Sequence, residues 1–255
     1  MAKTPDYFVG KNIVITGAAS GIGRETALIF AREGANVVCA DIGIAGAEAT
    51  VVAIESAGSG AGFAVDCDVT KRDQVVGMVA AAAEHFGRVH FQFNSAGSTV
   101  RRSNFSDIDD DLWQTTFDVN AKSVFLCMQA VLPHMLDNDD GVIVNVASGA
   151  MRKGGPGAST HYAAAKGAVN TLTMGVAREF VGRGIRCLSI SPAAVETPFQ
   201  VTSSPELIQR IVDDIPMGRF GRPDEIGELV LFLCSDACEF MTADTVNVSG
   251  GGGCR

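Results

Sequence analysis

Short apolar runs of strand length recur along the chain and predict a series of buried β-strands. The runs lie at residues 12–16, 36–40, 62–66, 89–93, 142–146, 185–190 and 245–248. Runs this short that are separated by longer periodic segments are typical of the strands of a covered sheet. The pattern therefore predicts a sheet of seven strands.

Longer segments between these runs have the periodicity of amphipathic helices. They lie at residues 21–33, 72–86, 110–136, 161–181 and 223–235. Strands that alternate with helices are joined by right-handed crossovers, which give a mostly parallel sheet with helices on both faces. The expected fold is α/β and doubly wound. In such a fold ligands bind at the carboxyl ends of the strands, so functional residues are expected directly after the apolar runs.

Length and composition favour one domain over residues 1–255. A chain of 255 residues with 47% hydrophobic content can bury a large single core. No apolar run approaches the roughly 20 residues of a membrane span, and the N-terminal residues contain no apolar secretory segment. We therefore expect a cytoplasmic protein. Its seven cysteines are an odd number set in apolar surroundings, which predicts reduced packing residues and neither disulfides nor a metal site.

The charge balance excludes two classes of partner. The formal net charge is −9, so the chain lacks the basic surface that nucleic acids require, and an anionic membrane would repel it. The expected ligands are small molecules.

A glycine-rich turn follows the first predicted strand. Gly17 permits a tight turn, Gly21 permits close approach of a pyrophosphate, and Gly23 permits close packing of the following helix. Ser20 and Ile22 lie in the same turn, whose helix N-terminus offers amide donors and a positive dipole. The spacing differs from GxGxxG, and a purely structural turn remains an alternative.

An aspartate at the end of the second run strengthens the prediction of a dinucleotide site. Asp41 lies 18 residues beyond Gly23, where a carboxylate can accept the ribose hydroxyls and repel a 2′-phosphate. Ile42 and Gly43 follow it, so no arginine is at hand to bind such a phosphate. The expected cofactor is NAD, and a helix or turn cap is the alternative role for Asp41.

Tyr162 and Lys166 form the most informative pair of candidate catalytic residues. Residues four apart share one face of a helix, so the ammonium can lie beside the phenol. A positive charge favours phenolate and would lower the pKa of Tyr162 from about 10. The same spacing also occurs on ordinary amphipathic helices, which is the alternative. The chain has only two tyrosines, Tyr7 and Tyr162.

These motifs together resemble the short-chain dehydrogenase/reductase family over essentially the whole chain. The matching segments are residues 16–23, 94–97, Asn120, Ser148 and residues 162–166, in this order. The resemblance implies one Rossmann-like domain and NAD(P)-dependent interconversion of alcohols and carbonyls. It also implies that Tyr162 is the acid/base, that Ser148 holds the substrate oxygen and that Lys166 binds the nicotinamide ribose. Asn120 would anchor a water of the proton relay.

The same resemblance implies further cofactor contacts. Asp68, with Val69 beside it, matches the residue that contacts adenine, and Asn94, Ala96 and Gly97 match the adenine-pocket motif. Pro192, Val195 and Thr197 match the segment beside the carboxamide.

Three departures from the family pattern qualify this match. Ser95 replaces a second asparagine, Ala193 replaces a glycine, and the spacing from Ser148 to Tyr162 is long. Ala193, beside the expected nicotinamide, puts the exact pose in doubt and leaves the reaction unaffected. The lengthened loop before Tyr162 would border the substrate.

The substrate contacts are expected from the segment after Gly97, the loop at residues 149–159 and a lid-like segment at residues 198–216. Arg101, Arg102, Arg152 and Lys153 fall in the first two, where they can recruit a carboxylate or phosphate or be solvated loop charges. The first hypothesis for the substrate is a secondary alcohol or ketone such as a sugar, sugar acid, hydroxy acid or polyol.

Other functions remain open at this point. The enzymatic alternative is a 3-oxoacyl-thioester reductase, and the alternative of another class is an NAD-binding regulator or scaffold without turnover. The family resemblance also implies a homotetramer or dimer formed through residues 110–136 and 161–181.

Overall fold

A seven-stranded parallel sheet lies at the centre of the molecule. The computed structural model describes residues 2–58, 60–198 and 204–252. The strands are β1 (Asn12–Thr16), β2 (Asn36–Asp41), β3 (Gly62–Asp66), β4 (Phe91–Asn94), β5 (Gly141–Val146), β6 (Ile185–Pro192) and β7 (Thr245–Val248). Their order is β3-β2-β1-β4-β5-β6-β7, with every neighbouring pair parallel. The doubly wound sheet predicted from the apolar runs is confirmed.

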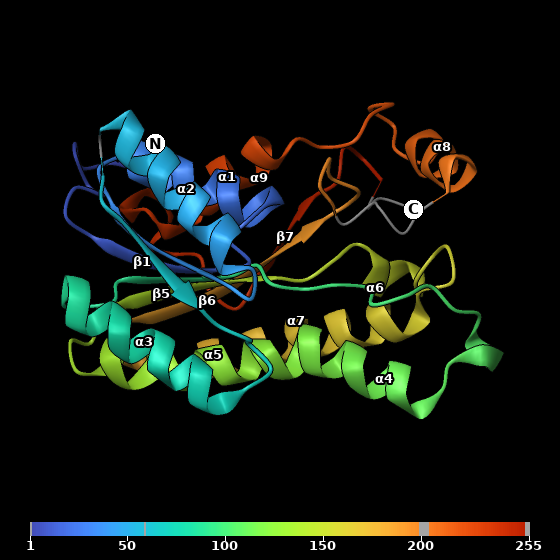
Figure 1. Ribbon diagram of the computed structural model, residues 1–255, viewed down its shortest axis with the longest axis horizontal. Coiled ribbons are helices and arrows are strands. Elements are labelled where there is room, and N and C mark those ends of the chain that lie inside the picture. Colours follow the sequence, from blue (N-terminus) through green and yellow to red (C-terminus); the bar gives the residue numbers. More distant parts are fainter. Residues whose placement is uncertain (1, 59, 199–203, 253–255) are drawn as a thin grey trace.

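Helices cover both faces of this sheet. They are α1 (Gly21–Arg32), α2 (Ile44–Ala57), α3 (Arg72–Phe86), α4 (Asp110–Phe117), α5 (Ser123–Leu136), α6 (Ala150–Lys153), α7 (Thr160–Phe180), α8 (Pro205–Asp213) and α9 (Pro223–Cys234). Figure 1 shows α1, α2 and α9 on one face, with α3, α4, α5 and α7 on the other. In the described part of the chain, no helix combines the length and the apolar character needed to cross a membrane.

The core is divided into two layers by the alternation of side chains along the strands. Ile13 and Ile15 of β1 point toward α1 and α9, whereas Val14 points toward the opposite layer. All three side chains are buried, because β1 is central and covered on both sides. Continuous apolar runs in the sequence therefore correspond to strands with two buried faces.

Helix α2 and the segment at residues 110–136 differ from the expectation, and α6 and α8 also lie outside the predicted helices. Helix α2 has an apolar, β-branched sequence around Thr50 and Val51, so its periodicity is weak and the pattern did not predict it. The predicted helix at residues 110–136 is instead two helices, α4 and α5, joined by a π-helical turn at Asp118–Lys122. Such turns contain an extra residue and often occur at functional sites.

The sheet changes direction of winding between β1 and β4. These two strands are neighbours, although β2 and β3 lie between them in sequence. Loops that leave their carboxyl ends diverge to opposite faces and leave a crevice between them. The crevice is where the site described below lies.

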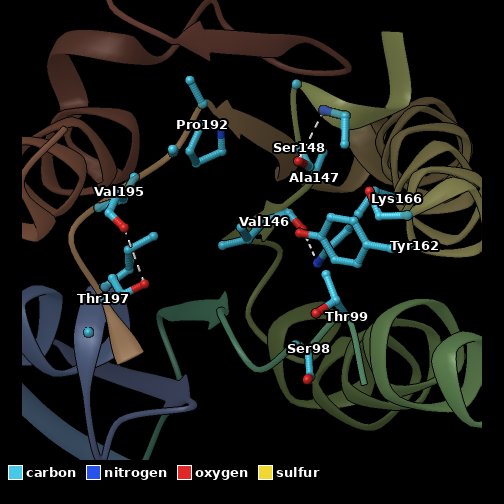
Figure 2. Close-up of a pocket in the computed structure, with 18 of the residues that line it drawn as sticks. Ser98, Thr99, Val146, Ala147, Ser148, Tyr162, Lys166, Pro192, Val195 and Thr197 are labelled. Atoms are coloured by element: carbon cyan, nitrogen blue, oxygen red, sulfur yellow. Dashed lines mark hydrogen bonds between the residues drawn. The ribbon is translucent and has the colours of Figure 1, made fainter. Parts of the chain in front are cut away.

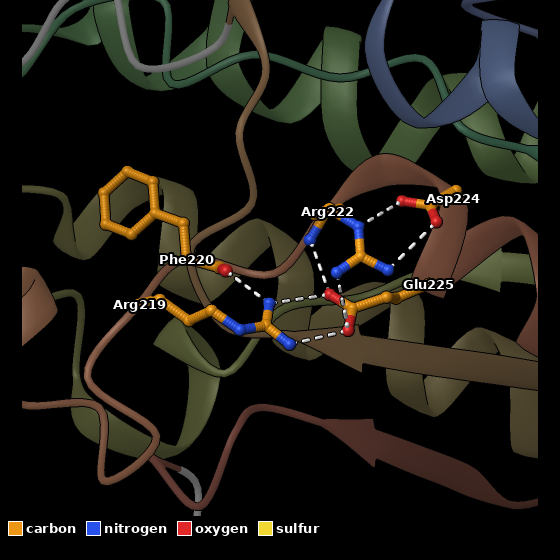
Figure 3. Close-up of polar contacts among 5 residues, drawn as sticks. All are labelled: Arg219, Phe220, Arg222, Asp224 and Glu225. Atoms are coloured by element: carbon orange, nitrogen blue, oxygen red, sulfur yellow. Dashed lines mark hydrogen bonds and ion pairs between the residues drawn. The ribbon is translucent and has the colours of Figure 1, made fainter.

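A polar cluster anchors the chain where it enters α9 (Figure 3). Arg219 donates two hydrogen bonds to the carboxylate of Glu225, at 2.7 and 2.9 Å, and Arg222 pairs with Asp224. These pairs are exposed, so each stabilises the fold only slightly. Their effect is local: Gly221, between the two arginines, accepts a hydrogen bond from Glu196 N and donates one to Ala194 O.

A buried chain of amide hydrogen bonds joins β4, β5 and α7. Gln92 Nε2 donates to Asn94 Oδ1, Asn94 Nδ2 donates to Asn145 Oδ1, and Asn145 Nδ2 donates to Thr173 Oγ1, at 2.8 to 3.0 Å. All four side chains are buried. Buried polar groups of this kind are costly unless paired, so the network fixes the relative positions of these elements.

Substituting Asn145 with alanine removes the acceptor of the Asn94 amide and leaves that donor buried. We expect Asn145→Ala to lower the free energy of unfolding by about 1–3 kcal/mol, measured by urea denaturation. The control is Asn138→Ala, since Asn138 is exposed and its side chain donates to the backbone carbonyl of His134. Its effect should stay below about 0.5 kcal/mol. Equal effects of the two substitutions would refute the structural role of the network.

Candidate active site

A cavity of about 470 Å³ opens at the carboxyl ends of the strands. Figure 2 shows Thr99, Ser148 and Tyr162 on one side of it and Pro192, Val195 and Thr197 on the other. The structure brings most of the predicted site residues to its wall, namely Gly17, Ser20, Gly21, Ile22, Gly23, Asp41, Gly97, Ser148, Tyr162, Lys166, Pro192, Val195 and Thr197.

The glycine turn after β1 leaves room that side chains would fill. Gly17 and Gly21 have φ values of +72° and +55°, where residues with a Cβ are strained. A Cβ on Gly23 would collide with the carbonyl oxygen of Gly17. Ser20 stands at the N-cap of α1 and its side chain makes no capping hydrogen bond there. The first amides of α1 are thus available to an anion such as a pyrophosphate, and the turn fits a dinucleotide.

Asp41, the last residue of β2, ties this turn to the neighbouring strand. Its Oδ2 accepts from Ala19 N at 3.0 Å, and its Oδ1 accepts from Gly43 N at 2.8 Å. The side chain therefore caps a turn, as the alternative held, and also lines the cavity. Each carboxylate oxygen has a second lone pair, so the group can still accept hydrogen bonds from a ligand.

Tyr162 and Lys166 lie on one face of α7 and are both buried at the cavity wall. Lys166 Nζ donates to Val146 O at 2.7 Å and lies 5.8 Å from the centroid of the Tyr162 ring. Ser148, two residues beyond the end of β5, hydrogen-bonds Tyr162 and also accepts from Ala150 N at 3.2 Å. The three side chains thus surround one position at the edge of the sheet.

The expectation that the pKa of Tyr162 is lowered is wrong. Burial raises the pKa of Tyr162 to about 12, and the Ser148 hydrogen bond and the charge of Arg102 offset only part of that rise. Burial also lowers the pKa of Lys166 to about 7. Desolvation disfavours the charged forms of both groups, and the ammonium is directed to the Val146 carbonyl.

Asn120 lies behind the cavity wall, in the π-helical turn between α4 and α5. It is fully buried, its Nδ2 donates to Ser98 O and Thr116 O, and its Oδ1 accepts from Ser98 N. A Cβ on Gly97 would lie 2.8 Å from Asn120 Oδ1 and 3.3 Å from Lys166 Nζ. Asn120 therefore holds the backbone of the segment after β4, with only the narrow Gly97 between it and Lys166.

Four predicted cofactor residues do not line this cavity: Asp68, Val69, Asn94 and Ala96. Asp68 accepts from Thr70 N and Oγ1, which makes it a turn cap. The Asn94 side chain belongs to the buried amide network, and Ala96 packs behind Gly17. These last two residues shape the cavity indirectly, by fixing the strand and the turn that border it.

The wall on the β6 side depends on the polar cluster before α9. Pro192 ends β6, and its carbonyl accepts from Gly149 N at 3.0 Å. Val195 is bridged to Gly221, so the Arg219–Glu225 cluster holds the segment that carries Val195 and Thr197 (Figure 3).

The lining residues Ser249 and Gly252, which follow β7, were missed at the sequence level. Ile211, Asp214 and Ile215, from α8 and the turn after it, lie in the segment at residues 198–216 from which substrate contacts were expected. The rule that ligands bind after strand ends would have found Ser249. The described end of the chain is packed, since Met217 N donates to Gly250 O. Within the predicted lid at residues 198–216, residues 199–203 lie outside the described residues, and α8 occupies most of the rest.

Comparison with known proteins gives matches along nearly the whole chain. A family model described as enoyl-(acyl carrier protein) reductase matches residues 17–252. The 3-oxoacyl-[acyl-carrier-protein] reductase of Thermotoga maritima is 37% identical over 245 residues, 95% of this chain and 97% of that protein. The 4-formylbenzenesulfonate dehydrogenase of Comamonas testosteroni is 36% identical over 243 residues, 93% of this chain and 96% of that protein.

Two solved structures share the fold closely. The 3-ketoacyl-(acyl-carrier-protein) reductase of Brucella melitensis complexed with NADH has a TM-score of 0.90 and 34% identity, covering 96% of this chain and 99% of that one. A 7α-hydroxysteroid dehydrogenase complexed with NADH and 7-oxo glycochenodeoxycholic acid has a TM-score of 0.91 and 32% identity, covering 97% and 96%. The family resemblance carried by the motifs is confirmed.

The lowered pKa of Lys166 predicts how stability depends on pH. The pKa of Lys166 is about 7 in the folded protein and near 10.4 in the unfolded chain. Between these two pH values the unfolded chain binds a proton at Lys166 that the folded protein does not bind, so the free energy of unfolding rises with pH. Lys166→Met removes this dependence. The test compares the free energy of unfolding of this variant with that of the wild type, measured by urea denaturation at pH 7 and at pH 9.5. The value for the variant minus the value for the wild type should be on the order of 2 kcal/mol lower at pH 9.5 than at pH 7.

The control for this measurement is Lys122→Met. Lys122 is exposed and pairs with Asp118 at 3.1 Å, so its substitution should give nearly the same stability difference at the two pH values. A pH-independent difference for Lys166→Met would contradict the lowered pKa.

Proposed function

The chain belongs to the short-chain dehydrogenase/reductase family, and on that premise we propose that it reduces the ketone of a 3-oxoacyl thioester with NADH. The protein is an NAD(P)-dependent oxidoreductase of CH–OH groups. The observation that carries the proposal is the meeting of Ser148 and Tyr162 in a cavity that also contains the glycine turn and Asp41.

The choice of substrate follows the relatives. Several of them are named 3-oxoacyl-[acyl-carrier-protein] reductase, and they favour the thioester over the sugar, hydroxy acid or polyol of the first hypothesis. The alternative of a scaffold without turnover has no support, because these relatives are named as enzymes.

Tyr162 is suited to donate a proton in the direction of reduction. With its pKa raised to about 12, the phenol is protonated at neutral pH and can give its proton to the ketone oxygen. Ser148 lies within hydrogen-bonding reach of Tyr162 and would donate to the same oxygen as negative charge develops on it. Bound NADH would supply the hydride.

Lys166 and Asn120 would act from behind Tyr162. Lys166 uses one of its three donors on Val146 O, which leaves donors for the hydroxyls of a nicotinamide ribose. We propose that Asn120, by holding Ser98, positions the water through which Tyr162 regains its proton.

The cofactor preference rests on Asp41. Held by the amides of Ala19 and Gly43, its carboxylate is fixed at the cavity wall. It can accept the hydroxyls of an adenosine ribose and would repel a 2′-phosphate, which favours NADH over NADPH. The related Brucella melitensis reductase was solved with NADH.

Exposed apolar side chains support a homo-oligomer. Trp113 of α4, Phe125 of α5 and Met174 of α7 are 37–41% exposed, and these helices share one face of the sheet (Figure 1). Large apolar groups that gather on exposed helices favour association. We propose that a second copy of the chain packs on this face, as a dimer or within a tetramer.

Tyr162→Phe tests the reaction. We expect it to lower kcat for NADH oxidation with acetoacetyl-coenzyme A by a factor of about 10²–10⁴, because the proton donor is lost. NADH binding, followed by fluorescence, should change little. Tyr7→Phe is the matched control, since Tyr7 lies under the Lys11 ammonium away from the cavity. Turnover retained by Tyr162→Phe would disprove the assignment.

Asp41→Ser tests the cofactor preference. Loss of the carboxylate should raise the ratio of kcat/KM with NADPH to kcat/KM with NADH by about ten-fold or more, which corresponds to roughly 1.4 kcal/mol. The control is Asp66→Ser: Asp66 is the register partner of Asp41 on β3 but does not line the cavity. If Asp41→Ser, like the control Asp66→Ser, leaves the ratio of the two kcat/KM values unchanged, Asp41 does not determine the preference for NADH.

A further inference from the structure

Two cationic side chains line the cavity from the segments that follow β4 and β5. Arg102 follows β4, and Lys153 ends α6. The chain as a whole carries a net charge of −9, so these side chains are opposite in sign to the net charge of the protein. Lys166, the other cation of the described wall, is directed to Val146 O. Arg102 and Lys153 are the two remaining cations of the described wall.

The position of Arg102 is fixed by three hydrogen bonds. Its Nη1 donates to Gly157 O at 2.8 Å, and the next residue, Ser103, donates its backbone N–H to Ala158 O at 2.9 Å. On the other side, His161 Nε2 donates to Arg101 O at 3.0 Å. A Cβ on Gly157 would lie 3.1 Å from Arg102 Nη1, so glycine at this position makes room for the guanidinium. Such preorganisation is typical of a recognition group.

Arg101 and Arg102 have different surroundings. The sequence left two roles open for them, recruitment of a carboxylate or phosphate and a solvated loop charge, and the surroundings distinguish these roles. Arg101 points outward and pairs with Asp109 at 2.7 Å, with half of its side chain exposed. Arg102, one residue later, is partly buried and lines the cavity. The same contrast holds between Arg152, which does not line the cavity, and Lys153, which does. In each pair only one side chain lines the cavity, although Lys153, like Arg152, is exposed to solvent.

Arg102 also acts electrostatically on the reacting position. Its charge lowers the pKa of Tyr162, although burial has the larger, opposite effect. Burial lowers the pKa of Arg102 itself, and Tyr162 opposes that shift. A guanidinium in partly desolvated surroundings forms strong, charge-assisted hydrogen bonds with carboxylate or phosphate oxygens.

We propose that Arg102 and Lys153 form an anion-binding subsite beside the reacting carbonyl, which holds a carboxylate or phosphate group of the substrate. The subsite deepens the proposed function and rests on carbonyl reduction at Tyr162. Its ligand has two chemical sources: the carboxylate of a free 3-oxo acid, or the phosphates of a coenzyme A or pantetheine thioester.

Three substrates with the same 3-oxobutanoyl group test the subsite. Acetoacetate carries a carboxylate, acetoacetyl-coenzyme A carries phosphates, and ethyl acetoacetate carries no charge. For Arg102→Gln and Lys153→Gln we expect the ratio of kcat/KM for an anionic substrate to that for the ester to fall about ten-fold or more. The ratio is the proper readout, because any effect of Arg102 on Tyr162 applies to all three substrates and cancels.

The matched controls are Arg101→Gln and Arg152→Gln, which remove the same charge from the same two segments outside the cavity. A fall with acetoacetate identifies the carboxylate as the ligand, and a fall with acetoacetyl-coenzyme A alone identifies the phosphates. The subsite is refuted if neither ratio falls in the two cavity variants, or if the control variants lower the ratios equally.

A binding measurement separates failure of the subsite from failure of the proposed function. Malonate and coenzyme A contain no ketone, so their binding to the NAD⁺ complex can be measured by calorimetry without turnover. Arg102→Gln should weaken the binding of at least one of them about ten-fold. If Arg102→Gln weakens binding but the wild type reduces none of the three substrates, the proposed reaction is rejected and the subsite is kept. If the substrates are reduced but Arg102→Gln leaves the binding of malonate and coenzyme A unchanged, or neither ligand binds, the subsite is rejected. Lys153→Gln, at an exposed position, provides the same test should Arg102→Gln fold poorly.

Discussion

The parallel hydrogen-bond ladder between β1 and β4 is the constraint on which the site depends. Because every strand runs in one direction, the glycine turn, Asp41, Ser148 and Pro192 all emerge at one edge of the sheet. Because β1 and β4 are neighbours although distant in sequence, the loops that follow them diverge and leave the crevice open. The buried chain of amides from Gln92 to Thr173 keeps β4, β5 and α7 in register beside that crevice.

Burial decides the chemistry of the central pair. Taking Tyr162 and Lys166 out of water raises the pKa of the phenol and lowers the pKa of the ammonium, so both neutral forms are favoured. A protonated phenol is the form that reduction needs, whereas oxidation needs phenolate. The same burial that lets α7 pack against the sheet thus keeps the phenol in its protonated form.

Hydrogen bonds to the backbone fix two charged side chains of the cavity wall. Asp41 is held by the amides of Ala19 and Gly43. Arg102 is held by the carbonyl of Gly157, in a segment that His161 and Ala158 also bind. The residues that fix these charges lie on loops, but each loop is joined by hydrogen bonds to a strand end or to α7. Precise placement of charge is therefore possible on loops.

The sequence by itself determined the strands, the glycine turn and the pairing of Tyr162 with Lys166. It could do so because strands with two buried faces leave continuous apolar runs, and because helical spacing alone places residues four apart on one face. Contacts distant in sequence decided the rest. Only the tertiary structure placed Asp68 and Asn94 away from the cavity, put Asn120 in a π-helical turn and brought Ser249 to the wall. It also decided the direction of the Tyr162 shift, since desolvation depends on how many distant atoms surround a group, and no local pattern records that.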